Sequence, residues 1–155
     1  MTEFEFFDYE PLTDGEIEVV VKDREVPPEN KRGYVPAYEF TVRLPVIHTP
    51  IGRIGLRIGN TERVVKYGGH IGYGIDEEYR GHHYAAKACR LVKRVALDHG
   101  IETLWITCSP ENIPSRRTCE VLGCEFVEIV DLPEDIDMYR KGERQVCRYR
   151  WDIRE

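Results

Sequence analysis

The segment covering residues 69–88, GHIGYGIDEEYRGHHYAAKA, constrains the fold of this chain more than any other. Its first seven residues favour a strand, a charged turn follows, and the alanine-rich end predicts the start of a helix. The first backbone N–H groups of a helix have no partner inside the helix and carry the positive end of its dipole. The segment therefore predicts an anion site, such as a site for a phosphate ester, although an ordinary strand-to-helix turn has the same features.

Two residues of the turn strengthen the case for an anion. Gly81 lets a ligand approach the backbone closely, and Arg80 can add a bidentate contact to a phosphate. The turn has neither the G-x-G-x-x-G pattern of dinucleotide-binding proteins nor the P-loop pattern. From the turn alone, a phosphate ester of another class and an ordinary strand-to-helix turn both stay open.

The rest of the chain predicts a mixed α/β (α+β) fold in one domain, residues 1–155. Alternating or β-branched runs predict strands, and apolar residues at helical spacing predict two helices, which end at Gly100 and Gly123. We expect the strand–helix–strand unit at 69–108 to be parallel with a right-handed crossover, and the flanking strands to be mostly antiparallel. The predicted strands are 16–23, 38–44, 51–58, 69–75, 102–108, 124–130 and 144–153, and the predicted helices are 83–99 and 112–122.

Composition and charge exclude several classes of function. The chain has no apolar run long enough for a transmembrane helix, and its acidic start lacks the pattern of a secretory signal, so we expect a cytoplasmic protein. A net charge of −6 argues against nucleic-acid binding and is compatible with a cationic amine, although it also simply keeps a small domain soluble. The five cysteines form no C-x-x-C pair, so we expect reduced, mostly buried thiols and no metal site.

The segment at 69–88 resembles motif A of the GNAT superfamily of acyl-CoA N-acyltransferases. That motif runs from a strand through Arg/Gln-x-x-Gly-x-Gly/Ala into a helix, with Arg80 first and Ala85 last in this chain. A second block, ITCSPENIPSRRTCEVLGCEFV, is similar to the family's Asn-x-x-Ala/Ser helix through Asn112, Ser115 and Gly123. Both blocks agree in order and spacing over residues 69–129, and the pattern is most similar to the branch with ribosomal-protein N-terminal acetyltransferases.

The resemblance implies a domain with six to seven strands, a central splayed parallel pair and acetyl-CoA as co-substrate. It implies that the pyrophosphate of acetyl-CoA lies on the turn, and that the pantetheine arm pairs with the preceding strand. The cofactor-binding residues implied in this way are Tyr73, Gly74, Ile75, Arg80, Gly81, His82, His83, Tyr84, Ala85, Asn112 and Ser115. The implied activity is transfer of an acetyl group to a primary amine of a small molecule or peptide by direct attack in a ternary complex.

The chain departs from the family pattern at three places. His83 stands where the family has glycine, and Cys119 stands where many members have a tyrosine that protonates the leaving thiolate. Gly69 occupies the place of a common general base, and His70 follows it. We name His70 and Cys119 as the candidate catalytic residues, while both are also compatible with purely structural roles. Three tyrosines are alternative proton carriers, namely Tyr34, Tyr67 and Tyr73.

The acceptor side differs as well. Most family members have two helices between the first two strands, whereas this chain offers a proline-rich stretch, so the segment 33–40 is our candidate for the acceptor site. The protein is expected to act as a monomer or homodimer. The main alternative is a non-enzymatic acyl-CoA-binding module, and two others are a general nucleotide-phosphate binder and a purely structural protein.

Overall fold

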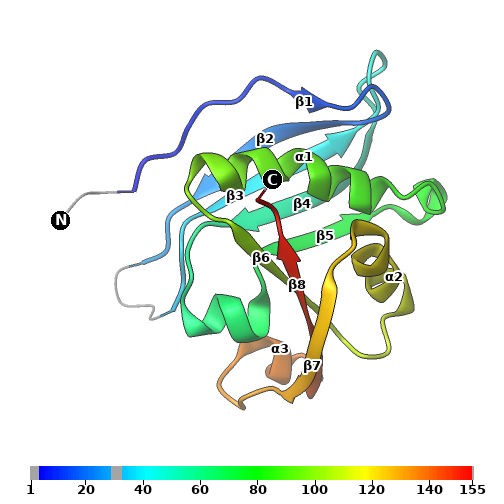
Figure 1. Ribbon diagram of the computed structural model, residues 1–155. Coiled ribbons are helices and arrows are strands. Elements are labelled where there is room, and N and C mark those ends of the chain that lie inside the picture. The colour runs from blue at the N-terminus through cyan, green and yellow to red at the C-terminus, as the bar shows by residue number, and fades with distance from the viewer. Residues whose placement is uncertain (1–3, 29–32, 155) are drawn as a thin grey trace.

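The computed structural model describes residues 4–28 and 33–154, and it places them in two sheets and three α-helices, with a short π-helix and a short 3₁₀-helix (Glu77–Tyr79) (Figure 1). The larger sheet is antiparallel with strand order β1-β2-β3-β4-β5, and the smaller one has the order β6-β8-β7. The larger sheet contains β1 (Leu12–Thr13), β2 (Glu18–Glu25), β3 (Ala37–Arg43), β4 (Pro50–Arg57) and β5 (Ile71–Ile75). The smaller sheet contains β6 (Thr103–Cys108), β7 (Glu125–Asp131) and β8 (Gln145–Asp152).

The predicted mixed α/β fold is confirmed, with two differences in the strands. The described residues form eight strands rather than six or seven, because the two-residue strand β1 pairs with the edge of β2 and is too short to show alternation. The splayed pair, β5 and β6, belongs to two different sheets, and the strands meet at His70 and Trp105.

Helix α1 (Tyr84–Asp98) follows β5 and covers one face of the larger sheet, as Figure 1 shows. Its inner face consists of small and β-branched side chains at helical spacing, which lets the helix pack closely on the strands. Burying a valine side chain contributes about 1.5–3 kcal/mol, so this face fixes the position of the helix start. The helix ends before Gly100, whose φ of +80° suits glycine. The buried residues are Ala86, Ala88, Cys89, Val92, Val95 and Ala96.

Helix α2 (Ile113–Leu122) begins and ends where the sequence predicts. The Asn112 side chain accepts a hydrogen bond from the Ser115 N–H at 3.2 Å, and Pro114 lies in the first turn. Gly123 ends the helix in a left-handed conformation with φ +80°. This capping fixes Ser115 beside β5.

Two short elements were not expected from the sequence. A π-helical turn, Arg63–Gly68, connects β4 to β5, and helix α3 (Asp137–Arg140) lies in the segment 131–143 that favours a loop. Both are too short to produce a helical hydrophobic period. They matter because each contributes residues to one of the pockets described below. Among the described residues, no helix is both long and apolar enough to cross a membrane.

Candidate active site

The two sheets are joined by hydrogen bonds between His70 and Trp105, and we call this junction the fork. The His70 N–H donates to the Trp105 carbonyl at 2.7 Å, and the Trp105 N–H donates to Nδ1 of His70 at 2.9 Å. Because Nδ1 accepts, the ring proton is on Nε2, which donates to Oδ1 of Asn60 at 2.9 Å. Gly69, with φ +75°, is required next to the fork because a Cβ there would lie 2.9 Å from the Trp105 carbonyl oxygen. Beyond this point β5 and β6 separate into different sheets.

His70 is fully buried, and both of its ring nitrogens are engaged. Burial lowers the pKa of its imidazole to about 4, because a charged ring in this position has little solvation. A general base needs a free nitrogen that faces the substrate. His70 therefore holds the fork together through its two ring nitrogens. A catalytic role for His70 stays a prediction.

A cleft of about 390 Å³ opens between the end of β5, the following turn and the first turns of α1 and α2. It gathers all of the predicted cofactor-binding residues except His82, whose ring instead lies 5.1 Å from the ring of Tyr84, centroid to centroid. Residues far apart in the sequence meet here because β5 runs between the starts of the two helices. The predicted residues that line the cleft are Tyr73, Gly74, Ile75, Arg80, Gly81, His83, Tyr84, Ala85, Asn112 and Ser115.

The turn presents backbone donors to this cleft. The side chain of His83, the N-cap residue, accepts no hydrogen bond from the first N–H groups of α1, so these groups keep their capacity to bind a ligand. The side chain of Arg80 folds back, and its Nε donates to the carbonyl of Ile75 at 2.9 Å. This contact holds the guanidinium beside the turn. The site thus offers helix-end N–H groups and a cation for an anionic ligand.

His83 has a backbone conformation that explains why glycine is expected at its position. It lies just before α1 with φ 59° and ψ 28°, in the left-handed region where most residues with a side chain are strained. Histidine is among the residues that tolerate this region best after glycine. The substitution thus keeps the turn intact and places an imidazole at the wall of the cleft.

We expect a glycine at position 83 to give a more stable protein than an alanine. Glycine adopts a positive φ freely, whereas alanine keeps a strained backbone, so His83→Gly should exceed His83→Ala by about 1 kcal/mol in free energy of unfolding. Urea denaturation of the two variants measures this difference. Equal stabilities would contradict a left-handed residue 83.

Tyr73 connects β5 to α2 across the cleft. Its hydroxyl lies 2.8 Å from Oγ of Ser115, and burial raises the pKa of the phenol, so it stays protonated at neutral pH. Cys119 lies one turn further along α2, is fully buried, and is not among the residues that line the cleft. A hydrogen bond with Cys124, together with burial, raises the pKa of the Cys119 thiol. The structure therefore brings Tyr73, but neither His70 nor Cys119, to the cleft.

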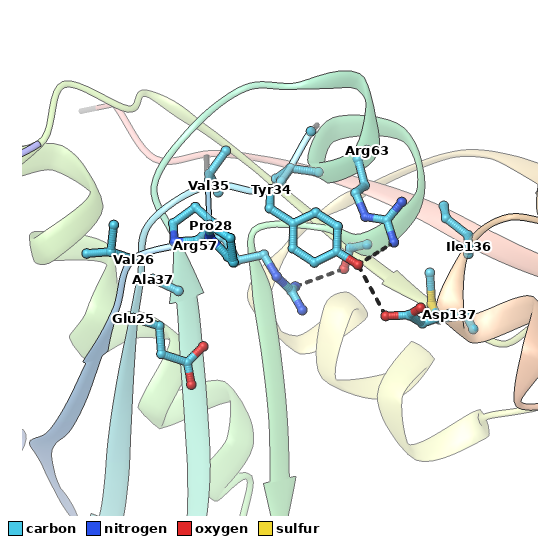
Figure 2. Close-up of a pocket in the computed structure, with 15 residues that line it drawn as sticks. Glu25, Val26, Pro28, Tyr34, Val35, Ala37, Arg57, Arg63, Ile136 and Asp137 are labelled. Carbon is cyan, nitrogen blue, oxygen red and sulfur yellow. Dashed lines mark hydrogen bonds between the residues drawn. The ribbon is translucent and has the colours of Figure 1, made fainter. Parts of the chain in front are cut away.

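A second pocket, of about 550 Å³, lies near the start of β5 (Figure 2). Four residues of the predicted acceptor segment line it, namely Gly33, Tyr34, Val35 and Ala37. Nη2 of Arg63 donates to the Tyr34 hydroxyl at 2.8 Å, and that hydroxyl donates to Oδ2 of Asp137 at 3.2 Å. These contacts connect three elements around the second pocket, namely the β2–β3 connection, the π-helical turn and α3. Tyr67, by contrast, lines neither pocket and packs in a small apolar cluster with Leu132, Ile136 and Val146.

Sequence reasoning missed three charged residues of this second pocket. Arg57 lies at the end of β4, Arg63 in the π-helical turn and Asp137 in α3. Tyr34 and Asp137 are 103 positions apart, so no local motif connects them. Only the fold brings these side chains together.

Comparison with known proteins identifies the family. The family model for the acetyltransferase (GNAT) domain matches residues 1–125, so this chain belongs to the GNAT acetyltransferase family. No curated protein matches the chain in sequence.

Solved structures with the same fold include three acetyltransferases. A GNAT acetyltransferase from Bacillus anthracis has a TM-score of 0.59 at 21% identity over 76% of this chain and 67% of its own. The ribosomal-protein-S5-alanine acetyltransferase from Vibrio fischeri has a TM-score of 0.60 at 19% identity over 77% and 63%. The microcin C7 self-immunity acetyltransferase MccE, in complex with acetyl-CoA and AMP, has a TM-score of 0.57 at 16% identity over 75% and 61%. This chain thus spans about two thirds of the length of the structures it matches, and at these identities the likeness establishes the fold.

Proposed function

We propose that this protein is an acetyl-CoA-dependent N-acetyltransferase that acts on a primary amine of a small molecule or peptide, and that residues 1–155 form one such domain. The observation that carries the proposal is the placement of two pockets at opposite ends of β5. A five-residue strand spans about 16 Å, a distance that an extended pantetheine arm can follow. One pocket then holds the phosphates and the other the acceptor.

In this proposal the cleft holds the cofactor by its backbone. The N–H groups at the start of α1, together with Arg80, bind the pyrophosphate of acetyl-CoA. Among the described strands, β5 pairs only with β4, so its other edge is open. The pantetheine arm pairs with this open edge. The Asn112 carboxamide uses its oxygen to cap α2, which leaves its nitrogen to donate to the arm.

The chemistry is a direct transfer. The acceptor ammonium gives a proton to water in the open pocket, and the neutral amine attacks the thioester carbonyl carbon. A backbone N–H of the splayed strand stabilises the oxyanion. The attacking nitrogen loses its second proton to water, the carbon–sulfur bond breaks, and the thiolate takes a proton from the Tyr73 hydroxyl, which regains one from solvent through Ser115. We place the donor at Tyr73 rather than Cys119 because Tyr73 lines the cleft. The overall reaction converts an ammonium and acetyl-CoA into an amide, CoA and one proton.

Calorimetric titration with acetyl-CoA, CoA and ATP tests the cofactor. We expect micromolar binding of acetyl-CoA, about −8 kcal/mol, and much weaker binding of ATP. Turnover is then followed as free CoA released with a panel of peptides, polyamines, aminosugars and amino acids. Absence of acetyl-CoA binding would refute the cofactor assignment, and binding without turnover on any amine would favour a non-enzymatic acyl-CoA-binding module.

A further inference from the structure

Arg57 presents a cation to the second pocket. Its Nη1 donates to the carbonyls of Gly69 at 3.0 Å and Gly68 at 3.3 Å, and these contacts hold the guanidinium at the pocket wall. Within residues 4–28 and 33–154, it has no carboxylate oxygen within 4.0 Å. Other arginines in the same part of the chain do form ion pairs, namely Arg24, Arg43, Arg53, Arg148, Arg150 and Arg154.

The location of this cation matters because it lies next to the fork. The Gly68 and Gly69 carbonyls that orient Arg57 come directly before His70, at the start of β5, where the thioester is expected. Residue 69 is the place of the expected general base, yet a side chain cannot fit there. The chain thus has a guanidinium next to the position at which many family members have a general base.

The remainder of the pocket combines charged and apolar side chains. Asp137 accepts from Tyr34, and Figure 2 shows the Glu25 carboxylate away from the group formed by Tyr34, Arg63 and Asp137. A pocket with cations, carboxylates and an apolar wall suits a zwitterion that carries an apolar body. The apolar lining includes Val26, Pro28, Val35, Val64, Ile136 and Met138.

We propose that the acceptor is an amino acid with an apolar side chain, whose carboxylate is bound by Arg57. This inference rests on the proposed acetyltransferase function. A planar guanidinium matches a carboxylate through paired hydrogen bonds, and Nη2 and Nε of Arg57 have no other partner among the described residues. Because the amine and the carboxylate of an amino acid share one carbon, binding at Arg57 holds the amine at the start of β5. The apolar side chain then packs on the apolar wall.

The test compares leucine with 3-methylbutylamine and leucinamide, which keep the apolar body and the amine but lack the carboxylate. We expect kcat/KM for leucine to exceed that for either analogue at least tenfold in the native protein. In Arg57→Gln this ratio should fall to about one, since a charged hydrogen-bonded pair is lost. Arg53→Gln is the matched control, because Arg53 is an exposed arginine on the same strand that lines neither pocket, and it should keep the ratio.

A binding measurement separates this inference from the proposed function. Leucine is titrated calorimetrically into the CoA-bound and the free protein, both native and Arg57→Gln. Leucine binding that is lost in Arg57→Gln, with acetyl-CoA affinity retained, supports the inference. Failure of leucine to bind, or equal use of leucinamide and leucine, overturns it and leaves the acetyltransferase proposal standing. Failure of acetyl-CoA to bind refutes the proposed function, and the leucine titration still decides the role of Arg57.

Discussion

Replacing His70 with asparagine is expected to lower the free energy of unfolding by about 3 kcal/mol at pH 7. The shorter side chain cannot reach both Asn60 and the Trp105 N–H, so a buried polar group loses its partner at a cost of about 1–3 kcal/mol, and the space left behind adds to that cost. Urea denaturation measures the change. His48→Asn is the control, because His48 is exposed and its positive φ suits asparagine.

The stability difference between native protein and His70→Asn should also depend on pH. The folded-state pKa of His70 is about 4, below the ordinary value of 6.5, so the unfolded chain takes up the proton at a higher pH than the folded one. The stabilisation from a neutral His70 is therefore fully present above pH 6.5 and is lost as the pH falls toward 4. With 1.36 kcal/mol for each pKa unit, the loss totals about 3 kcal/mol.

The gap in unfolding free energy between the two proteins should thus shrink between pH 7 and pH 4.5. Other titrating groups, such as His99 and the carboxylates, are common to both proteins and cancel in the difference. A gap that stays constant over this range would contradict a buried neutral His70. A gap that is small at every pH would contradict its role at the fork.

The sequence could group the residues of the cleft in which we propose that the cofactor binds, because most of them are close in sequence. The residues from Tyr73 to Ala85 are contiguous, so one strand, one turn and one helix start place them together. Asn112 was predictable as the cap of α2, whereas Ser115 came from the family resemblance, and the structure shows that the Ser115 N–H is the partner of the cap. The spacing of buried residues in α1 likewise follows from a local period.

The fork and the second pocket were not predictable, because they depend on pairs that are distant in sequence. The role of His70 depends on Trp105, 35 positions away, and a shift of one residue in register would turn the same histidine to the other face of the sheet. Arg57, Arg63 and Asp137 come from three separate elements and share no pattern. The fork is a contact of this kind. It joins β5 to β6 at one point, and beyond that point the two strands belong to different sheets.

Replacing Tyr73 with phenylalanine is expected to lower kcat about 100-fold, the low end of the effect of a positioned proton donor. The phenol lines the cleft, and its hydroxyl meets Ser115 Oγ at 2.8 Å. Because burial raises its pKa, it stays protonated and can supply a proton to the leaving thiolate at neutral pH. Without it the thiolate must leave unprotonated into a partly desolvated cleft, which raises the barrier.

The readout must separate proton donation from a loss of structure. The hydroxyl lies 2.8 Å from Oγ and 3.4 Å from the carbonyl oxygen of Ser115, so its removal should cost only about 1 kcal/mol of stability and leave the Kd for acetyl-CoA within a few-fold. Tyr9→Phe is the matched control, because the Tyr9 hydroxyl also donates one hydrogen bond, to Asp98, and Tyr9 lines neither pocket. A drop in kcat of less than threefold in Tyr73→Phe would exclude Tyr73 as the donor. A parallel loss of acetyl-CoA affinity would instead make Tyr73 a binding residue, because a group that acts only on the leaving thiolate changes kcat without changing cofactor binding.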